Sequence, residues 1–314
     1  MITEIKSKDI IEYIISEECK GLRADQAIAQ ENKDFSRSLI QKWIKKGNIL
    51  VNGKTIKAKD ILCIDDKITI FPEENINIEF IVSEYIPIEV VYEDNDLIII
   101  NKKSNIISHP AAGHKIGTLA NGLIYMYPEL SNLPRSGLIH RLDKDTTGLL
   151  IVARNIKSYT RLVKSMQDRD INRYYIAYVH GLLMKNGQIN KPISRHNIDR
   201  KKMSVNINGK EAVTDYEVLQ NYKNFSKVKL KLHTGRTHQI RVHMQYEGYP
   251  IIGDQMYGIK KNNININEHI KKFPRQALHA FQLIFNHPYM EKIINLESSL
   301  PEDLINLEKI LNDA

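Results

Sequence analysis

One carboxylate stands among basic residues in the most informative stretch of this chain, residues 140–148. Asp143 lies between Arg141 and Lys144, and a continuous apolar run follows over residues 149–153. This order predicts a turn that leads directly into a buried strand. Enzymes often carry a reactive side chain on a loop that a rigid strand holds in place, so Asp143 is a candidate catalytic residue. The structural alternative is a turn aspartate that its basic neighbours neutralise.

A carboxylate that acts as a nucleophile or base must stay ionised, and a neighbouring guanidinium both favours that state and orients the group. Two arginines in the last third of the chain could supply it. Arg241 is our first choice, because it lies on a helix predicted over residues 237–247, with Thr237 as its cap and Gly248 as its end. Arg236, at the start of that helix, is the second choice. Either arginine could instead contact phosphates or structural carbonyls.

The first part of the chain combines a basic helix with a tight hairpin. A short helix is predicted near residues 22–29, and a second one follows Ser36, which can act as its N-cap. Along the second helix the apolar residues share one face by the helical period, and the basic residues fall largely on the other. Asn52-Gly53 then marks a two-residue hairpin turn, and another strand is predicted at residues 68–70. The basic residues of the second helix are Arg37, Lys42, Lys45 and Lys46.

A polar, acidic linker over residues 72–84 separates this part from a larger one that we expect to begin at residues 86–87. Strands outnumber helices in the larger part and often follow one another, which predicts an α+β fold with a mixed, mostly antiparallel β-sheet. The predicted strands are residues 97–101, 149–153, 174–179, 212–219 and 227–232, and the predicted helices are residues 155–167 and 237–247.

Four strings of the larger part together resemble the RluA family of pseudouridine synthases, which isomerise uridine in RNA. One departure occurs in the first string, where Lys103-Ser104-Asn105 follows Lys102 in place of the family's usual Pro-x-Gly. The resemblance implies the pseudouridine synthase fold, and it covers nearly the whole chain. The strings are residues 100–113, 140–148, 173–181 and 232–244.

The resemblance also implies roles for individual residues. Tyr175 matches the active-site tyrosine, which would stack on the target uracil and supply or take a proton; a strand tyrosine is otherwise usually part of a core. Arg141 resembles the side chain that fills the gap when the target nucleotide flips out, and we expect His140 and Arg236 to contact RNA beside it. Asp143 would either attack ribose C1′ or remove the proton at C2′, and both routes stay open.

The string over residues 36–54 and the order of its elements resemble an S4 RNA-binding domain. On this interpretation the basic helix lies along phosphates, which give affinity with little sequence information. The alternative is an ordinary amphipathic helix with a solvated charged face. We therefore expect an S4-like α/β domain and linker over residues 1–80, with a core of about residues 20–71, and a catalytic domain over residues 81–314.

Composition agrees with a polyanionic partner and excludes several other classes. The net charge is +8 with a pI near 9.2. No apolar run is long enough for a membrane span, the first 18 residues are too acidic for a signal or transit peptide, and only Cys19 and Cys63 occur, far apart. We expect a cytoplasmic protein without disulfides. No spacing typical of a metal site or a phosphate-binding glycine loop is present, so no metal and no cofactor is implied.

Within the family, the resemblance is to enzymes that modify large-subunit (23S) ribosomal RNA, and it implies the helix 69 stem-loop as substrate. We expect the chain to act as a monomer, on ribosomal RNA that is free or within the assembling or assembled subunit. Two alternatives stay open: the same chemistry on another ribosomal or transfer RNA site, and a non-catalytic RNA-binding assembly factor. The presence of Asp143, Tyr175 and Arg241 argues against the second.

Overall fold

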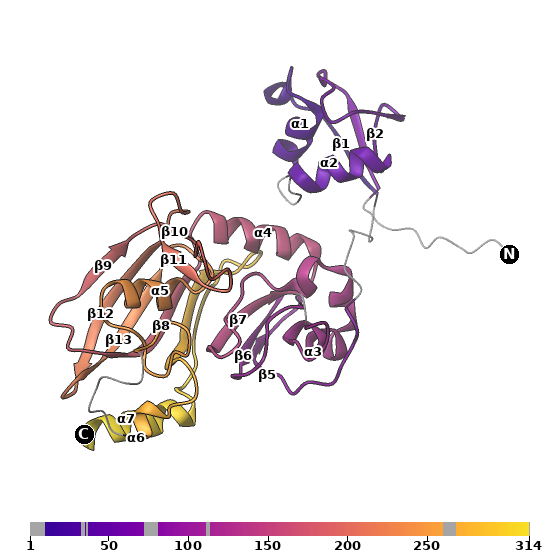
Figure 1. Ribbon diagram of the computed structural model, residues 1–314. Coiled ribbons are helices and arrows are strands. Elements are labelled where there is room, and N and C mark those ends of the chain that lie inside the picture. The colour runs from indigo at the N-terminus through magenta and orange to yellow at the C-terminus, as the bar shows by residue number, and fades with distance from the viewer. Residues whose placement is uncertain are drawn as a thin grey trace.

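The computed structural model describes residues 10–32, 35, 37–71, 81–110, 114–259 and 268–313. These residues build two units with separate hydrophobic cores, an N-terminal unit over residues 10–71 and a large unit over residues 81–313 (Figure 1). Ser36, which we predicted as a helix cap, lies outside the described residues. Within the part of the chain that the structure covers, no helix has the length and apolarity needed to cross a membrane.

The N-terminal unit is a four-stranded antiparallel sheet, in the order β1-β4-β2-β3, with two helices packed against it. The two predicted helices, the hairpin and the last strand are all present. Strand β1 was not predicted: it is only four residues long, follows an acidic segment, and alternates between half-buried and exposed positions. The unit therefore begins before residue 20. Its elements are β1 (Ile11–Ile14), a 3₁₀ turn (Glu17–Cys19), α1 (Ala24–Glu31), α2 (Arg37–Lys46), β2 (Ile49–Val51), β3 (Lys54–Thr55) and β4 (Lys67–Ile70).

Helix α2 packs as its apolar period predicts. Ile40 and Trp43 are buried, and the Trp43 ring lies edge-on to Phe35 with 4.9 Å between ring centroids. Gly47, with φ of 79°, ends the helix in the left-handed conformation that glycine adopts without steric cost. Asn52-Gly53 also has positive φ at both residues, which matches the twist of the flanking strands.

The large unit is built on a nine-stranded sheet, in the order β5-β6-β7-β14-β8-β13-β12-β9, with β15 also paired to β14. Every pairing is antiparallel except β7 with β14, so the predicted mixed, mostly antiparallel sheet is confirmed. The strands are β5 (Glu89–Glu93), β6 (Leu97–Lys102), β7 (Thr147–Ala153), β8 (Asn172–His180), β9 (Gly187–Asn190), β12 (Val213–Asn221), β13 (Phe225–Leu232), β14 (Leu278–Asn286) and β15 (Ile293–Glu297), with a separate hairpin of β10 (Ile193–Arg195) and β11 (Met203–Val205).

Strands β6 and β7 lie inside this sheet, which explains their continuous apolar sequences. Leu150 and Val152 face one core while Leu149 and Ile151 face another on the opposite side of the sheet. Helix α4 contributes Leu162 to the second core. The helices of the large unit are α3 (Leu119–Met126), α4 (Ile156–Gln167), α5 (Gln239–Tyr246), α6 (Glu268–Lys271) and α7 (Glu302–Asp313), with 3₁₀ turns at Pro128–Asn132 and Pro134–Gly137.

The junction of β7 and β14 holds the predicted turn in place. The amide of Thr146 donates to the carbonyl of Asp143 over 3.1 Å, which closes the turn before β7. Gly148, with φ of 115°, is required here: a Cβ at this position would lie 2.2 Å from the carbonyl oxygen of Ala280. Two backbones approach so closely that the turn carrying Asp143 is anchored to the centre of the sheet.

Two boundaries and one strand differ from those predicted. The large unit begins before residue 86, because Ile81 already packs into its main core. Residues 89–93 form a strand that was not among those predicted. Helix α5 starts at Gln239 after His238, whose φ is 57°, and not at a Thr237 cap. The side chain of Gln239 accepts the amide of Arg236 instead, which leaves Thr237 without a capping role.

Candidate functional site

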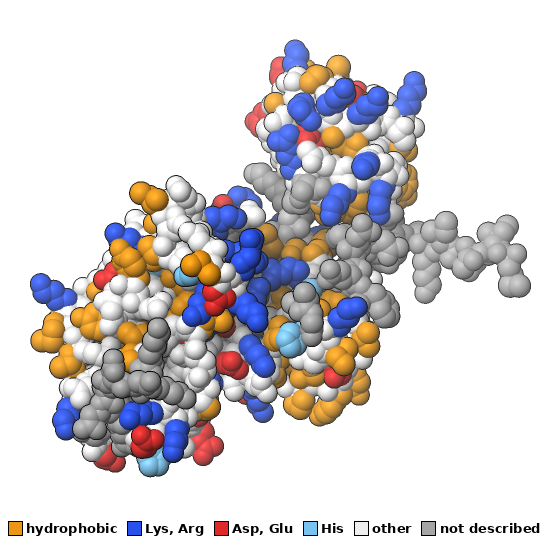
Figure 2. Space-filling model, in the orientation of Figure 1, with side chains coloured by type: hydrophobic (Ala, Val, Ile, Leu, Met, Phe, Trp, Pro, Cys, Tyr) orange, Lys and Arg blue, Asp and Glu red, His pale blue; other side chains and the backbone are white. Residues whose placement is uncertain are grey.

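A pocket of about 480 Å³ opens in the large unit where the turn before β7 meets β8 and the start of α5. Figure 2 shows Lys and Arg side chains gathered in the middle of the large unit. Six arginines line the pocket and Asp143 is its single acidic residue among those described. The pocket brings together every site residue that the sequence suggested for the large unit, namely His140, Arg141, Asp143, Tyr175, Arg236 and Arg241.

Arg241 is the arginine that pairs with Asp143. Its Nη1 donates to Asp143 Oδ2 over 2.9 Å, and the Asp143 side chain is only 17% exposed. Arg236 turns away, because its Nε donates to the backbone carbonyl of Glu211. The fold thus decides between the two candidates, although they lie five residues apart.

A second carboxylate, Asp254, holds Arg241 from the other side and was not anticipated. Arg241 donates through Nε and Nη2 to the two oxygens of Asp254, at 2.6 and 2.9 Å. Burial acts to lower the pKa of Arg241, but the hydrogen bonds that it donates to Asp254 and the charge of Asp143 outweigh burial and raise that pKa. Burial likewise acts to raise the pKa of Asp254, and Arg241 outweighs it and holds that pKa low. The only sequence signal was a lone Asp after Ile251-Ile252-Gly253, which is weak evidence by itself.

His238 and Tyr257 complete the surroundings of Asp143. The Tyr257 hydroxyl accepts the amide of Met203 at 2.8 Å and lies 2.8 Å from His238 Nδ1. Every group is satisfied when the hydroxyl proton is donated to Nδ1, which leaves the proton of His238 on Nε2, 3.8 Å from Asp143 Oδ1. Burial is the main cause that lowers the pKa of His238, so the ring is neutral at pH 7. The ring of His238 thus faces the catalytic candidate.

Tyr175 lies on β8 and its side chain is almost fully buried at the pocket wall. Burial is the largest cause that raises its pKa, and the negative charge of Asp143 adds to it. The phenol is therefore protonated at pH 7 and presents an apolar ring with a hydroxyl donor. Both parts of the role that the resemblance implied, stacking and proton transfer, need this combination.

The other predicted pocket residues differ in accessibility. Arg141 is exposed at the rim, as a side chain that meets RNA must be. His140 is buried, and its Nε2 accepts the amide of Ile151. Burial, with the charges of Arg173 and Arg135 nearby, lowers the pKa of His140 to about 3. His140 thus lines the pocket with only 7% of its surface exposed, and its direct contact with RNA stays a prediction.

Four basic residues of α2 were predicted to contact phosphates, and one of them has another role. Arg37 is paired with Asp25, whose side chain is fully buried. Arg37 thus neutralises a buried carboxylate, and because its own side chain is 46% exposed, its contact with phosphate stays a prediction. Lys42, Lys45 and Lys46 are exposed along the helix.

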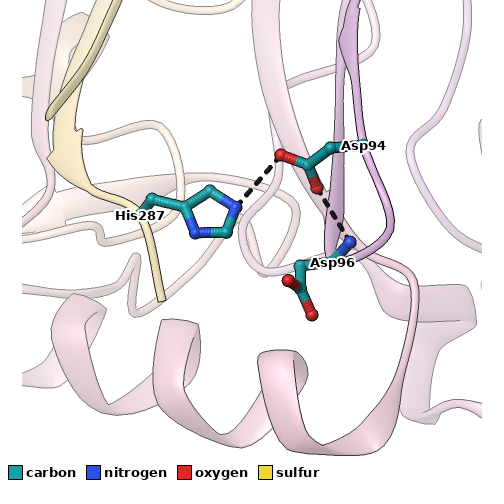
Figure 3. Close-up of side chains that lie close together, drawn as sticks. All are labelled: Asp94, Asp96 and His287. Carbon is teal, nitrogen blue, oxygen red and sulfur yellow. Dashed lines mark hydrogen bonds and ion pairs between the residues drawn. The ribbon is translucent and has the colours of Figure 1, made fainter. Parts of the chain in front are cut away.

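One cluster outside the pocket has the composition of a metal site, formed by Asp94, Asp96 and His287 (Figure 3). Asp94 and His287 already use their acceptor atoms in hydrogen bonds. His287 Nδ1 accepts two backbone amides, so Nε2 carries the proton and donates to Asp94 over 3.0 Å. Asp94 also accepts the Tyr92 hydroxyl and two amides, and Asp96 accepts the hydroxyl of Ser158. These hydrogen bonds connect the β5–β6 turn to α4 and to the end of β14.

Comparison with known proteins identifies the family. Residues 96–246 match the RNA pseudouridylate synthase family, and residues 22–68 match the S4 domain. The chain is 41% identical over 299 residues to the ribosomal large subunit pseudouridine synthase D of Pseudomonas aeruginosa, covering 94% of this chain and 93% of that protein. It is also 41% identical over 303 residues to the protein of that name from Haemophilus ducreyi, with 95% and 93% covered.

Solved structures agree with this result. Human RNA pseudouridylate synthase domain containing 4 superposes with a TM-score of 0.57 at 25% identity, covering 71% of this chain and 92% of that one. Human RNA pseudouridylate synthase domain containing 1 gives 0.53 at 25% identity, with 73% and 96% covered. The α+β fold of this chain, with its arginine-paired aspartate in a basic pocket, is therefore that of a pseudouridine synthase. The chain belongs to the RNA pseudouridylate synthase family, and it carries an S4 domain at its N-terminus.

Proposed function

We propose that this enzyme converts uridine to pseudouridine in large-subunit ribosomal RNA, with Asp143 as the catalytic residue. The observation that carries the proposal is the state of Asp143, a partly exposed carboxylate paired with Arg241 on one oxygen in a pocket of six arginines. The names of the relatives, ribosomal large subunit pseudouridine synthase D, support the choice of RNA.

The proposed reaction breaks the bond between uracil N1 and ribose C1′, turns the base, and joins C5 to C1′. Arg241 fixes one oxygen of Asp143, while Oδ1 makes no hydrogen bond to the described residues and is left for attack on C1′ or for removal of the C2′ proton. Arg241 is itself fixed by Asp254, so the carboxylate cannot swing away without breaking a buried ion pair. This support makes Arg241 and Asp254 positioning residues for Asp143.

Tyr175 has the second catalytic role in this proposal. Its ring would stack on the uracil after the nucleotide leaves the helix, because the glycosidic bond is not accessible in a stacked strand. Its protonated hydroxyl can give a proton to the base or take one from it. Arg141, exposed at the rim, would fill the gap left in the RNA.

The chain divides into two functional domains in this proposal, with the boundary at about residue 80. The N-terminal domain binds RNA through the exposed lysines of α2, Lys42, Lys45 and Lys46, and the domain from residue 81 onward carries out catalysis. The separate cores of the two units and the packing of Ile81 into the larger one support that boundary.

The helix 69 stem-loop of 23S RNA is the substrate that we propose, and the enzyme would act as a monomer in the cytoplasm, where ribosomes assemble. The test is to map pseudouridines in total RNA from cells with the gene, without it, and with the Asp143→Asn variant. Loss of specific large-subunit pseudouridines in the second and third samples is expected. Losses confined to transfer RNA would reassign the substrate, and no change in any RNA would favour a non-catalytic assembly factor.

A further inference from the structure

Arg173 is a buried cation without a counterion. It lies on β8, is 7% exposed, and lines the pocket. Its Nε has no hydrogen-bond partner, and in the described part of the chain no carboxylate forms an ion pair with it. Burying a charged group without a partner is costly, so an unpaired buried arginine at a pocket indicates an anionic ligand from outside the chain.

The other buried arginines of the large unit show how unusual this is. Arg241 is held by two carboxylates. Arg275, 4% exposed, donates to both oxygens of Asp303 and to three backbone carbonyls. Only Arg173, among the buried arginines that the structure describes, is left with its donors unused.

Arg173 points to the same side as the catalytic tyrosine. Successive side chains of a strand alternate between faces, so Arg173 and Tyr175 share the pocket face, about 7 Å apart along β8. Gly235 lies directly against the guanidinium: a Cβ there would be 2.8 Å from Nη1 of Arg173. The absence of a side chain at residue 235 leaves room for the guanidinium beside the pocket.

The neighbouring wall of the pocket is built for the same kind of ligand. Arg135 lines the pocket and stands in a left-handed conformation, followed by Ser136 and Gly137, with φ of 54°, 52° and 75°. Such backbone is strained for residues other than glycine and clusters at functional sites. The buried side-chain atoms without partners in the described residues are Ser136 Oγ, His140 Nδ1 and Arg173 Nε. His140 and Arg173 line the pocket, and each of these two atoms can donate a hydrogen bond for which the described residues offer no acceptor.

We infer that Arg173 and Arg135 bind a backbone phosphate of the RNA next to the flipped uridine, which makes this wall a phosphate subsite of the active site. The inference rests on the proposed function. A phosphate offers the negative charge and the several acceptor oxygens that unpaired guanidiniums require. A uracil carbonyl would satisfy one donor but leave the charge uncompensated. Asp143, the single acid of the pocket lining, is already committed to Arg241.

The experiment pairs a protein variant with a chemical change in the RNA. A helix 69 stem-loop is prepared with one neutral methylphosphonate linkage at a time around the target uridine. Binding is measured in the Asp143→Asn background, so that the RNA stays unmodified. Neutralising the contacted phosphate should weaken binding about tenfold or more, the size of a charge-assisted hydrogen bond. When Arg173→Met is added, the same methylphosphonate should weaken binding by less than about twofold, because the guanidinium that contacts the phosphate is absent.

Lys309→Met is the matched control, since it removes one exposed charge on α7, away from the pocket lining. It should leave the methylphosphonate penalty unchanged. Arg173→Met should also reduce the salt slope of log K by roughly 0.7 to 0.9, as the loss of one phosphate contact requires. If no linkage shows a penalty that depends on Arg173, the phosphate subsite is wrong.

Stability provides an independent readout. Arg173→Met should not lower the melting temperature of the RNA-free enzyme, because the variant removes an uncompensated charge. Arg275→Met should lower it by about 6 °C or more, because Asp303 and three carbonyls lose their donor. A large drop for Arg173→Met would mean that the side chain has a structural partner, and would overturn the inference. Pseudouridine formation by the wild-type enzyme tests the proposed function separately, so the two failures are distinguishable.

Discussion

Two aspartates, one in each unit, are paired with arginine and yet differ in what they can do. Asp25 of the N-terminal unit is fully buried, and Arg23, Arg37 and Gln41 together occupy both of its oxygens. Asp143 of the large unit is 17% exposed, and one oxygen is bound by Arg241 while the other faces the pocket.

The difference separates a structural carboxylate from a reactive one. Burial acts to raise the pKa of Asp25, and hydrogen bonds from Gln41 and Arg37 outweigh it, so the group is ionised and fully satisfied. Asp143 is also paired with an arginine, but one of its oxygens makes no hydrogen bond within the part of the chain that the structure describes, and attack or proton removal needs such an oxygen. A paired aspartate is therefore a candidate catalytic residue when one of its oxygens makes no hydrogen bond.

The largest expected effect is that of Asp143→Asn. We expect isomerisation to fall by at least about 10³-fold, since several kcal/mol of transition-state stabilisation are lost, while RNA binding stays nearly intact because many Lys and Arg carry it. Single-turnover pseudouridine formation and a binding assay on the same RNA measure the two. Isomerisation near the wild-type rate would end the assignment of Asp143.

Arg241→Ala should have the next largest effect. Removing one partner of a buried pair costs about 3–5 kcal/mol, and here it unpairs both Asp143 and Asp254. The single-turnover rate should fall more than the affinity for RNA. Arg236→Ala is the control, and it should weaken binding with little effect on rate, because Arg236 bonds a carbonyl and not Asp143. An unchanged rate for Arg241→Ala would make Arg241 a phosphate-binding residue.

Acidification should destabilise the large unit and change the stability of the N-terminal unit little. Burial lowers the pKa of His140 to about 3 and that of His279 to about 4, whereas an unfolded histidine titrates near 6.5. Because the unfolded chain then binds more protons, stability of the large unit should fall below pH 6.5, by about 1.4 kcal/mol per pH unit for each histidine. Residues 1–71 contain no histidine.

That contrast can be measured with one protein. Trp43 is the sole tryptophan and is buried in the N-terminal core, so its fluorescence follows unfolding of that unit, while hydrogen exchange of β7 and β8 follows the large one. Between pH 7 and 5 the large unit should lose stability and the N-terminal unit should change little. Equal losses in both would contradict the neutral, buried state of His140 and His279.

Asp25→Asn should affect stability and leave chemistry alone. We expect a loss of about 1–3 kcal/mol in the N-terminal unit, because Arg23 and Arg37 lose a charged acceptor but can still reach water. Trp43 fluorescence during denaturant unfolding gives the value. The single-turnover rate at saturating RNA should equal that of the wild-type enzyme, and a slower rate would show that the two units are coupled in catalysis.

Removing residues 1–80 should have the subtlest effect. The rest should stay folded, because Ile81 and the residues after it carry their own core. Each lost lysine–phosphate contact should reduce the salt slope of log K by roughly 0.7 to 0.9, and Lys42, Lys45 and Lys46 are the candidates. Equal salt slopes and equal site selectivity for the two proteins would mean that the S4 domain does not bind the substrate RNA.

The sequence by itself was enough for the class of enzyme and for most elements. Helix α2, the Asn52-Gly53 turn and strand β7 depend on periodicity and turn residues within a few positions, and such local signals can be read directly. The same is true of Asp143, whose neighbours alone mark a turn before a strand. Strand β1 was missed because it is short and because its pairing partner, β4, lies far along the chain.

Tertiary structure decided which groups meet, because that depends on strand order and not on neighbours in sequence. Arg241 reaches Asp143 across 98 residues, while Arg236, almost as near in sequence, does not. Asp254 became visible only as the partner of Arg241. In the sequence Arg173 is only the first residue of the string 173–181, and nothing there assigns it a role. In the folded chain its guanidinium is buried at the pocket, and no carboxylate among the described residues pairs with it. Only this arrangement indicates that Arg173 binds an anion.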